Sequence, residues 1–461
     1  MAEWTDVVTT TEVTVGDKRI TFEAGRLAKQ ASGAVLVRSG DSMVLVTAVV
    51  SKSERNVDFF PLTVDIEEGM YAAGKIPGGF IKKEGRASDR AILTARMIDR
   101  PVRPLWPAGF NKETHIVATV LSVDKVNPHD VLAMIGASAA LSISEAPFEG
   151  PIGAVRVGKV DGSWVVNPTY EELDNSSINL IVAGTADAIS MVEAGCDIVD
   201  EAEVIAGLEV AHEAIKKQVQ VISAWAAQIG RPAMEFTPRV ADPLLKDKIK
   251  ARFGGDVLTA VSTLEKHERS AAVAAVKQQV LAEMVAAESA DPALETAELS
   301  RAFDAVEKEL IRRRIAVDKV RPDGRAADEI RKLSVEVGVA PRTHGSGLFT
   351  RGQTQVLTLL TLGASRDEQR IDGLGVDESK RFMHQYKFPP FSVGEAGFMR
   401  GPGRREIGHG ALAERALVPI VPEAEAFPYT IRLVSETLES NGSSSMASVC
   451  ASTLAMSVRM M

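Results

Sequence analysis

GAVLVRSGDSMVLVT at residues 33–47 and GSGLFTRGQTQVLTL at residues 345–359 are the two stretches that decide the fold of this chain. In each stretch, apolar and polar residues alternate on both sides of a glycine, Gly40 in the first and Gly352 in the second. Alternation interrupted by a turn residue is typical of a β-hairpin. Either the two hairpins share only common turn chemistry, or they are copies of one unit.

The spacing of further matches favours duplication. Gly40 and Gly352 differ by 312 positions (352 − 40), and KIP at 75–77 falls on KFP at 387–389 at the same offset. The small-residue run at 133–141 falls near 446–454. Three matches in the same order at nearly one offset predict two copies of one domain.

The rest of the chain predicts helices beside the strands. Strands are expected at 20–22, 34–38, 43–49, 116–123 and 179–182, with helices at 88–98 (capped by Ser88 and ended by Pro101) and 131–142. Further helices are expected at 271–290 and 293–316, separated by Asp291-Pro292. We therefore predict an α/β (α+β) fold with a first domain at 1–234, an all-α helical domain at 235–320 and a second, incomplete copy at 321–461.

The composition excludes several classes of protein. The 461 residues are 45% hydrophobic and 25% charged and include only 2 Cys, which excludes a disulfide scaffold. No apolar run is long enough to cross a bilayer, and residues 1–6 lack the pattern of a secretory signal. The net charge of -9 argues against a uniformly basic nucleic-acid binder but allows a local basic channel. We expect a cytoplasmic protein without a membrane partner.

Two segments of the second copy could bind anions. Residues 403–410, GRREIGHG, place Arg404 and Arg405 side by side ahead of a helix expected at 411–417, and adjacent guanidinium groups can fork onto phosphate oxygens. His409 lies between two glycines, which lets the backbone approach a ligand closely. The alternative is a solvated arginine pair and a turn histidine.

The second of these segments is a serine loop, ESNGSSSM at 439–446. A Gly-Ser loop that opens into a helix offers hydroxyl groups, free backbone N–H groups and the positive end of the helix dipole. An ordinary N-cap with flexible serines is the alternative. The two segments support each other because both would bind an anion in one copy.

The first copy differs from the second at this place. It carries NPHDV at 127–131, where Asp130 would repel phosphate, so we expect the first copy to have lost the site. Its basic residues remain, and Arg96 and Arg100 are four apart on one helical face, suited to an RNA backbone or a shared phosphate. The chain lacks the GxxxxGK[ST], HExxH, GxGxxG and GxSxG signatures, which argues against a nucleotide triphosphatase, a zinc protease, a Rossmann dehydrogenase and a serine hydrolase.

These motifs resemble a known family. PRTHGSGLFTRGQTQ at 341–355 is similar to the opening hairpin of ribonuclease PH-type domains, and 386–395, 404–410 and 439–450 follow in that family's order. The duplication, the helical insert and KIPGG at 75–79 resemble the bacterial polynucleotide phosphorylase family more narrowly.

The resemblance implies a fold, an activity and partners. The fold consists of two ribonuclease PH-like βαβ-type domains joined by a helical domain. The enzyme is a polyribonucleotide nucleotidyltransferase of mRNA turnover, which shortens single-stranded RNA from its 3′ end with inorganic phosphate, assisted by Mg2+ or Mn2+, and releases nucleoside diphosphates. It forms a homotrimer around a central channel and can join an RNA-degradation assembly.

The resemblance also assigns residues. Ser443, Ser444 and Ser445 match the loop that holds the attacking phosphate, and Arg404, Arg405 and His409 match residues that act on phosphate and the RNA 3′ end. Arg96 and Arg100 match first-domain arginines of the same cleft. Phe80, Lys82, Lys83 and Arg86 match a loop at the channel mouth that grips RNA, although lysines replace its usual arginines. The family's metal-binding aspartates, like its KH and OB-fold modules, would lie beyond residue 461, so no metal ligand is assigned.

Three hypotheses follow for the chain itself. The first is a phosphorolytic exoribonuclease, and the second is a catalytically incomplete RNA- or phosphate-binding remnant of that enzyme. The third, a basic oligomerisation scaffold, leaves the serine loop and Arg404-Arg405 unexplained. Phosphate-dependent release of nucleoside diphosphates separates the first from the second.

Overall fold

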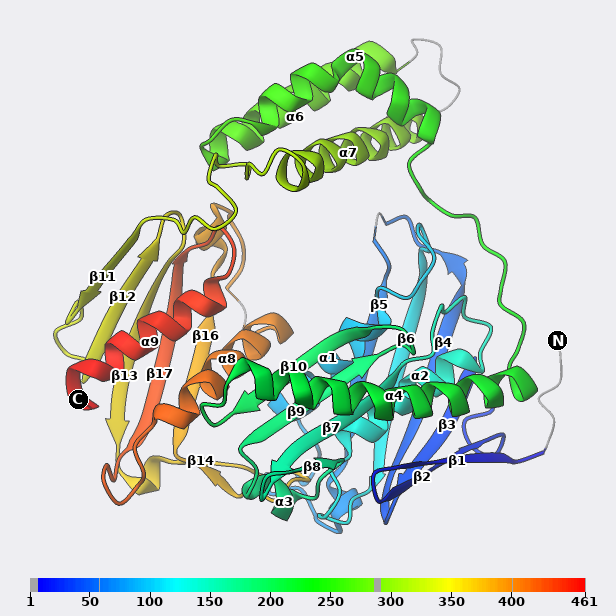
Figure 1. The fold of residues 1–461 in the computed structure, drawn as a ribbon, viewed down its shortest axis with the longest axis vertical. Coiled ribbons are helices and arrows are strands. Elements are labelled where there is room, and N and C mark those ends of the chain that lie inside the picture. The colour runs from blue at the N-terminus through cyan, green and yellow to red at the C-terminus, as the bar shows by residue number, and fades with distance from the viewer. Residues whose placement is uncertain (1–6, 58, 286–291, 400, 461) are drawn as a thin grey trace. The chain divides into compact units, whose positions relative to one another are not determined.

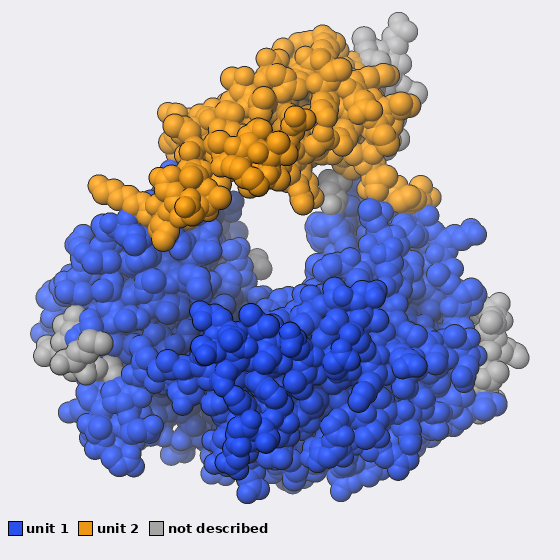
Figure 2. Space-filling model, viewed as in Figure 1, with its two compact units in different colours: residues 1–236, 333–461 blue, residues 237–332 orange. Residues whose placement is uncertain are grey.

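The computed structural model describes residues 7–57, 59–285, 292–399 and 401–460. These residues form two compact units, one of residues 1–236 with 333–461 and one of residues 237–332 (Figure 2). Two expectations lie outside the described residues: the absence of a signal at 1–6, and the helix end and breaker at 286–291.

The first copy is a six-stranded sheet with helices (Figure 1). Its strand order is β1-β2-β3-β4-β6-β5, antiparallel except for the parallel pair β5/β6. The elements are β1 (Thr9–Val15), β2 (Lys18–Ala24), β3 (Gly33–Ser39), β4 (Ser42–Glu54), β5 (Leu62–Glu68), the 3-10 turn η1 (Met70–Ala73), α1 (Asp89–Val102), β6 (Lys112–Ser122) and α2 (Asp130–Ser142).

The second copy repeats this topology. Its five-stranded sheet has the order β11-β12-β13-β17-β16, and the last two strands are again the parallel pair. The elements are β11 (Leu333–Val337), β12 (Gly345–Arg351), β13 (Gln355–Gly363), η2 (Ser365–Asp367), β14 (Gln369–Arg370), β15 (Ser379–Lys380), β16 (Phe382–Lys387), η3 (Pro390–Val393), α8 (Arg404–Leu417), η4 (Val418–Ile420), β17 (Thr430–Glu439) and α9 (Ser444–Met460).

The register of the two hairpins confirms the duplication. Gly33 pairs with Ala48 in β3/β4, and Gly345 pairs with Leu360 in β12/β13. Both partners are displaced by the same 312 positions that the sequence predicts (345 − 33 and 360 − 48).

A second layer follows the first copy. It comprises β7 (Gly153–Val160), β8 (Ser163–Val166), α3 (Tyr170–Asp174), β9 (Ile178–Gly184), β10 (Ile189–Cys196) and α4 (Glu201–Ile229), with the sheet order β10-β9-β7-β8. Helix α4 packs on β7, β9 and β1. Of this layer, the sequence predicted the strand at 179–182, which lies within β9.

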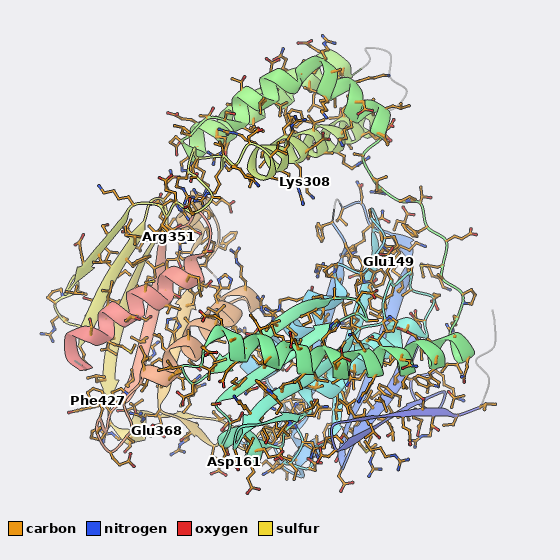
Figure 3. The ribbon with its side chains drawn as sticks, in the orientation of Figure 1. Glu149, Asp161, Lys308, Arg351, Glu368 and Phe427 are labelled. Carbon is orange, nitrogen blue, oxygen red and sulfur yellow. The ribbon has the colours of Figure 1, made fainter. Side chains whose placement is uncertain are left out.

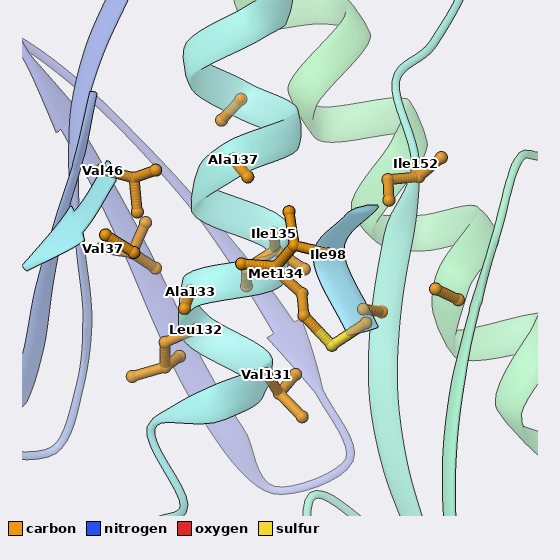
Figure 4. Packing of buried hydrophobic residues seen from close by; sticks show 14 of the residues in the cluster. Val37, Val46, Ile98, Val131, Leu132, Ala133, Met134, Ile135, Ala137 and Ile152 are labelled. Carbon is orange, nitrogen blue, oxygen red and sulfur yellow. The ribbon is translucent and has the colours of Figure 1, made fainter. Parts of the chain in front are cut away.

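Helix α2 lies between the two sheets of the first copy and has no solvent-facing side. It contacts β3, β4 and β6 of one sheet and β7 of the other, and twelve of its residues are buried. Its glycine lets the strands approach closely, since a Cβ on Gly136 would lie 2.6 Å from Cγ2 of Val46. Figure 4 shows Val37 and Val46 beside Ala133 and Ala137 of this helix. A helix that is apolar all round belongs inside a domain.

The other unit contains the three helices α5 (Pro243–Val261), α6 (Lys266–Met284) and α7 (Pro292–Ala316), which pack on one another. Its core has Phe253, Val257, Phe303 and Val306 at its centre. No helix in the described part of the chain is long and apolar enough to cross a membrane.

Glycines let helices lie directly on strand backbones at equivalent places in both copies. A Cβ on Gly33 would lie 2.0 Å from the carbonyl oxygen of Ala140 in α2, and a Cβ on Gly345 would lie 2.2 Å from that of Ala455 in α9. Real Cβ atoms do not come this close to backbone, so each glycine is required by helix–sheet packing rather than by a turn.

The helix predicted from 88 begins as expected, since the Ser88 side chain accepts from the backbone N–H of Ala91 at 3.0 Å. The prediction that Pro101 ends it is wrong, because the helix continues to Val102 and the N–H of Arg103 still bonds to Asp99. Pro101 is therefore tolerated within the last turn.

We expect Gly33→Ala to destabilise the first copy by about 1–3 kcal/mol, the usual cost of overpacking a core. Trp106 and Trp225 lie in this core and report its unfolding by fluorescence. The urea midpoint should fall for Gly33→Ala and stay unchanged for Gly85→Ala, since Gly85 has nothing within 4 Å of its Cβ position. Equal midpoints for Gly33→Ala and wild type would contradict the close approach.

Candidate anion and RNA site

Helix α8 begins at Arg404, seven residues before the predicted start at 411. Glu406 makes this start, because its carboxylate accepts from the backbone N–H of Gly403 and from that of Phe388, both at 2.8 Å. The expectation that Arg404, Arg405 and His409 precede the helix is wrong. They lie within its first two turns, which fixes their directions relative to one another.

The glycines around His409 admit protein neighbours. A Cβ on Gly408 would lie 2.4 Å from Nε of Arg96, and one on Gly410 would lie 3.3 Å from the backbone oxygen of His384 in β16. Gly408 therefore lets the first-copy arginine lie against α8, and Gly410 lets α8 lie against its own sheet. The prediction of two glycines that open the backbone to a ligand is replaced by this packing role.

The serine loop opens into helix α9 as predicted. Gly442 and Ser443 have positive φ angles of 86° and 50°, and α9 starts at Ser444. Arg351 is the last residue of β12 (Figure 3). It holds the loop by donating to the carbonyl oxygens of Gly442 at 3.0 Å and Ser443 at 3.2 Å. Thr354 also donates to Gly442, at 3.2 Å. The N–H groups at the start of α9 are thereby held at one place.

The three serines have different surroundings. Ser443 is exposed and Ser445 is partly exposed, whereas the Ser444 hydroxyl is buried and lies 2.6 Å from the hydroxyl of Tyr386. The ring of Tyr386 also meets that of His409 edge to face at 5.0 Å. Tyr386 therefore connects the start of α9 to α8, and Ser443 and Ser445 are the hydroxyls that face outward.

A cavity of about 650 Å³ lies between α1 and α8, within the unit that holds both copies. Of the predicted site residues it brings together Arg96, Arg100, His409 and Ser445. Four other predicted site residues do not line it: Arg404 and Arg405, on the same helix as His409, and Ser443 and Ser444, which precede Ser445 in the chain. The polar groups Arg90, Tyr170, Glu193 and Arg415 also line it, and the sequence did not single them out as site residues.

The electrostatics of this cavity are set by clustered cations. Burial and the charge of Arg100 lower the pKa of Arg96, and Arg405 adds to the effect. Burial, followed by the charges of Arg405 and Arg96, lowers the pKa of His409 to about 4. His409 is therefore neutral at pH 7, and its buried Nδ1 has no hydrogen-bond partner among the described residues. A neutral imidazole can exchange hydrogen bonds with an anion that the arginines attract.

Arg404 and Arg405 have different roles in the structure. Arg404 pairs with Asp65 of β5 and donates to the carbonyl oxygen of Val64, so it joins α8 to the first copy. Arg405 is exposed, lies over the ring of Phe388 at 4.8 Å and has no ion-pair partner in the described ranges. Arg405 is the better placed of the two for a ligand.

Glu193 of β10 also joins the copies. It pairs with Arg100 of α1 and, at 2.6 Å, with Arg415 of α8. Burial raises the pKa of Glu193, but the two arginines outweigh burial and hold it below its usual range. Arg100 therefore lines the cavity with its positive charge already partly neutralised by Glu193.

The first copy carries a carboxylate of its own at the equivalent helix start. Asp130 is the first residue of α2, is 4% exposed and pairs with Arg156 at 2.5 Å. Burial alone would raise the pKa of Asp130, but Arg156 and Arg90 lower it below its usual range. The charge of Asp130 is thus matched within the protein, and the loss of the phosphate site from the first copy stays a prediction.

The loop with Phe80, Lys82, Lys83 and Arg86 does not line the cavity. It is held by the second copy, because the backbone N–H of Gly78 donates to Asp372 at 2.9 Å. Phe80 is 100% exposed, and the three cations of this loop are exposed as well.

Sequence reasoning missed Arg351 and Tyr386. Arg351 falls on Ser39 at the 312 offset (351 − 312), so the copy with a serine loop also has an arginine at its hairpin turn. That difference between the copies could have marked Arg351. Tyr386 precedes the matched KFP segment and carried no signal of its own.

No group of three or more His, Cys, Asp or Glu able to hold a metal occurs among the residues that the structure describes. No metal ligand is therefore assigned among these residues, and no chemical step is derived through a metal ion.

Three family models match the chain. The model described as "3' exoribonuclease family, domain 1" matches residues 16–147 and 329–458, and the model for domain 2 of that family matches 150–214. The model described as "Polyribonucleotide nucleotidyltransferase, RNA binding domain" matches 244–326. The two domain 1 matches cover more than half of the chain, so the chain belongs to the 3′ exoribonuclease family, and they confirm its duplicated architecture.

Its curated relatives carry one name. Polyribonucleotide nucleotidyltransferases of Geobacillus kaustophilus, Halalkalibacterium halodurans and Bacillus subtilis are 56%, 54% and 53% identical over 96%, 95% and 95% of this chain. The chain spans 61% to 62% of the length of these relatives. Among solved structures, rice Rrp46 aligns at 13% identity with a TM-score of 0.37 over 48% of this chain and 94% of its own.

His384 is a second histidine with a lowered pKa, about 4, because it is buried beneath α9. Its Nε2 lies 3.0 Å from the hydroxyl of Ser435 and 3.1 Å from that of Ser452. In the unfolded chain these two histidines take up a proton near pH 6.5, whereas in the folded protein they stay neutral until the pH falls to about 4. His384 and His409 therefore lower the stability of the fold as the pH falls through this window.

We expect two histidine resonances to titrate near pH 4 in a carbon-13 NMR titration of the folded chain. The resonance absent from His384→Gln assigns one, and that absent from His409→Gln assigns the other. A midpoint near 6.5 for either would contradict the burial of that ring.

Proposed function

We propose that this chain carries the phosphate- and RNA-binding half-sites of a 3′-to-5′ phosphorolytic exoribonuclease, a polyribonucleotide nucleotidyltransferase. The observation that carries the proposal is the cavity where two first-copy arginines, Arg96 and Arg100, meet His409 and Ser445 of the second copy. Membership of the 3′ exoribonuclease family and the names of the relatives support the same activity.

In this mechanism an oxygen of inorganic phosphate attacks the last phosphodiester of RNA. The new P–O bond forms as the bond to the penultimate 3′ oxygen breaks, and that oxygen takes up a proton. The products are a nucleoside diphosphate and an RNA that is one nucleotide shorter. Because the two reactants are both anions, positioning and charge neutralisation supply the catalysis.

The surroundings of each side chain suggest its role in this reaction. Ser443, Ser445 and the first N–H groups of α9 hold the attacking phosphate, and Arg405 neutralises it. Arg96 and Arg100 neutralise the RNA phosphodiester from the first copy. His409, neutral at pH 7, exchanges hydrogen bonds with the reacting oxygens. Three residues position these groups. Arg404 acts through its ion pair with Asp65, and Ser444 through its hydrogen bond with Tyr386. Tyr386 in turn acts through its ring contact with His409.

Further features belong to this proposal. They are assistance by Mg2+ or Mn2+, a homotrimer, association with an RNA-degradation assembly, a cytoplasmic location, and the domain bounds 1–234, 235–320 and 321–461. Phe80, Lys82, Lys83 and Arg86 would bind RNA ahead of the cavity, since they are exposed on one loop.

The test is an assay of the purified chain on single-stranded RNA with magnesium, with and without inorganic phosphate. We expect nucleoside diphosphates only when phosphate is present. Arg405→Ala should slow their release by about 100-fold or more, the cost of one lost charge-stabilising donor. Arg366→Ala, which removes an exposed arginine of η2, should not change the rate.

Other outcomes would contradict the proposal in different ways. Release of nucleoside monophosphates without phosphate would indicate hydrolysis. Stabilisation by phosphate in thermal unfolding without product release would indicate a phosphate-binding protein that is not a catalyst. If phosphate neither supported product release nor stabilised the chain, the oligomerisation scaffold would be the remaining hypothesis.

A neutral His409 makes a separate prediction about anion binding. Sulfate keeps a constant charge between pH 5.5 and 7.5, so the stabilisation it gives should not vary in this range after correction for the unliganded protein. A charged His409 would instead bind sulfate more tightly as the pH falls through 6.5. A shift that grows at low pH in wild type but not in His409→Gln would contradict the lowered pKa.

A further inference from the structure

Two loops occupy equivalent positions in the two copies. The first runs from η1, which ends at Gly74 with φ 66°, to α1. The second runs from η3, which ends at Gly394 with φ 77°, to α8. Both helices have 14 residues, so each loop connects the same left-handed turn to the same length of helix.

Each loop exposes one phenylalanine almost completely. Phe80 is 100% exposed in the first loop and Phe398 is 89% exposed in the second, and each is followed by an exposed apolar residue, Ile81 or Met399. A large aromatic side chain in water gains nothing from folding, since stabilisation comes from apolar area removed from water. The two rings lie at different positions within the corresponding loops, Phe80 six residues after Gly74 and Phe398 four residues after Gly394. An exposed ring in both loops nevertheless indicates a ligand.

The two loops approach each other within the unit that holds both copies. A guanidinium nitrogen of Arg86 lies 3.8 Å from the position of a Cβ on Gly401, three residues after Phe398. The contact between Gly78 and Asp372 also holds the first loop against the second copy.

The charges around Phe398 select the kind of ligand. Arg86 reaches this loop from the first copy at Gly401, and Arg405 is the second residue of the helix that follows it. An exposed ring on a loop that cations approach suits single-stranded nucleic acid, whose bases stack on the ring while its phosphates pair with the cations. An apolar protein surface would use the ring but not the charges.

The distance along the chain fits a strand that ends at the candidate site. Phe398 and Arg404 are six positions apart in the chain, a span of at most about 20 Å. That is the length of about six nucleotides stacked at ~3.4 Å each. A strand whose last phosphodiester lies near Arg405 therefore has upstream bases within reach of Phe398.

We propose that Phe398, the exposed ring of the second-copy loop that corresponds to the Phe80 loop of the first copy, is a base-stacking residue for single-stranded RNA. The proposal rests on the proposed function for its ligand, and it adds a specific RNA-binding residue next to the arginines of α8. Stacking of this kind tolerates any base, as a processive exonuclease requires.

The test is fluorescence anisotropy of the full chain with a labelled 20-nucleotide single-stranded RNA in phosphate-free buffer. Phe398→Ala should weaken binding by about 5- to 100-fold, the usual effect of removing one stacking ring. Phe398→Leu should weaken it similarly, and Phe398→Trp should bind within about twofold of wild type. Phe59→Ala, which removes another exposed phenylalanine (68% exposed), is the matched control and should not change binding.

The salt dependence is a second readout. Phe398→Ala should leave the slope of log affinity against log salt unchanged, because no charge is removed. Binding that Phe398→Leu preserves and Phe398→Ala loses would show apolar docking and overturn the stacking role. Unchanged RNA binding in all Phe398 variants would overturn it too, and loss of self-association in Phe398→Ala by light scattering would then identify a second copy as the occupant.

Failure of the proposed function gives a different result. If wild type bound no RNA at all, both proposals would fall, whereas wild-type binding that is insensitive to Phe398 would remove this inference alone. Stabilisation by phosphate does not involve Phe398 and should be equal in wild type and Phe398→Ala.

Discussion

The candidate site depends on one contact, the backbone of α9 lying directly on the backbone of β12. Gly345 and Gly347 allow it, since a Cβ on either would lie within 2.4 Å of a carbonyl oxygen of α9. The contact fixes the axis of the helix, and Arg351 and Thr354 at the end of the hairpin fix the turn that leads into it. The hairpin that defines the fold thus also aims the positive end of α9. A helix merely resting on side chains would leave that end less well defined.

The second constraint is the set of contacts that hold the two copies together, so that residues of both copies line one cavity. Leu374 of the second copy lies in the hydrophobic core of the first, Arg404 pairs with Asp65, and Glu193 pairs with arginines of both copies. Arg96 lies against α8 because Gly408 has no side chain to displace it. Cations from one copy and helix termini from the other therefore meet without a large conformational change. Duplication makes this possible, because one copy can change its chemistry while the other keeps the fold.

The sequence predicted the duplicated hairpins well, since the 312 offset reappears in their registers. The match of KIP at 75–77 to KFP at 387–389 was wrong, because KIP follows η1 (Met70–Ala73) whereas KFP precedes η3 (Pro390–Val393). Local periodicity also identified β3, β4, β6 and α2, because the residues within each element alone, by their alternation or by the spacing of small residues, indicate its secondary structure. It failed at α8, because glycines at 408 and 410 suggest a loop while tertiary packing against Arg96 and β16 stabilises a helix. The different roles of Arg404 and Arg405, and of Ser444 and its neighbours, could not be predicted, because they depend on contacts with residues distant in the chain.

The contrast between the copies explains why one helix start is a candidate site and the other is not. At the start of α2, the carboxylate of Asp130 accepts from the N–H of Val131 and pairs with Arg156, so the positive end of the helix already faces an anion supplied by the protein. At the start of α9 the first helical residue is Ser444, and its hydroxyl turns inward to Tyr386. No protein carboxylate pairs with Arg405 among the described residues, and His409 stays neutral beside it. The described residues of the second copy therefore supply no carboxylate to balance Arg405, and its exposed guanidinium is open to solvent or to an anion.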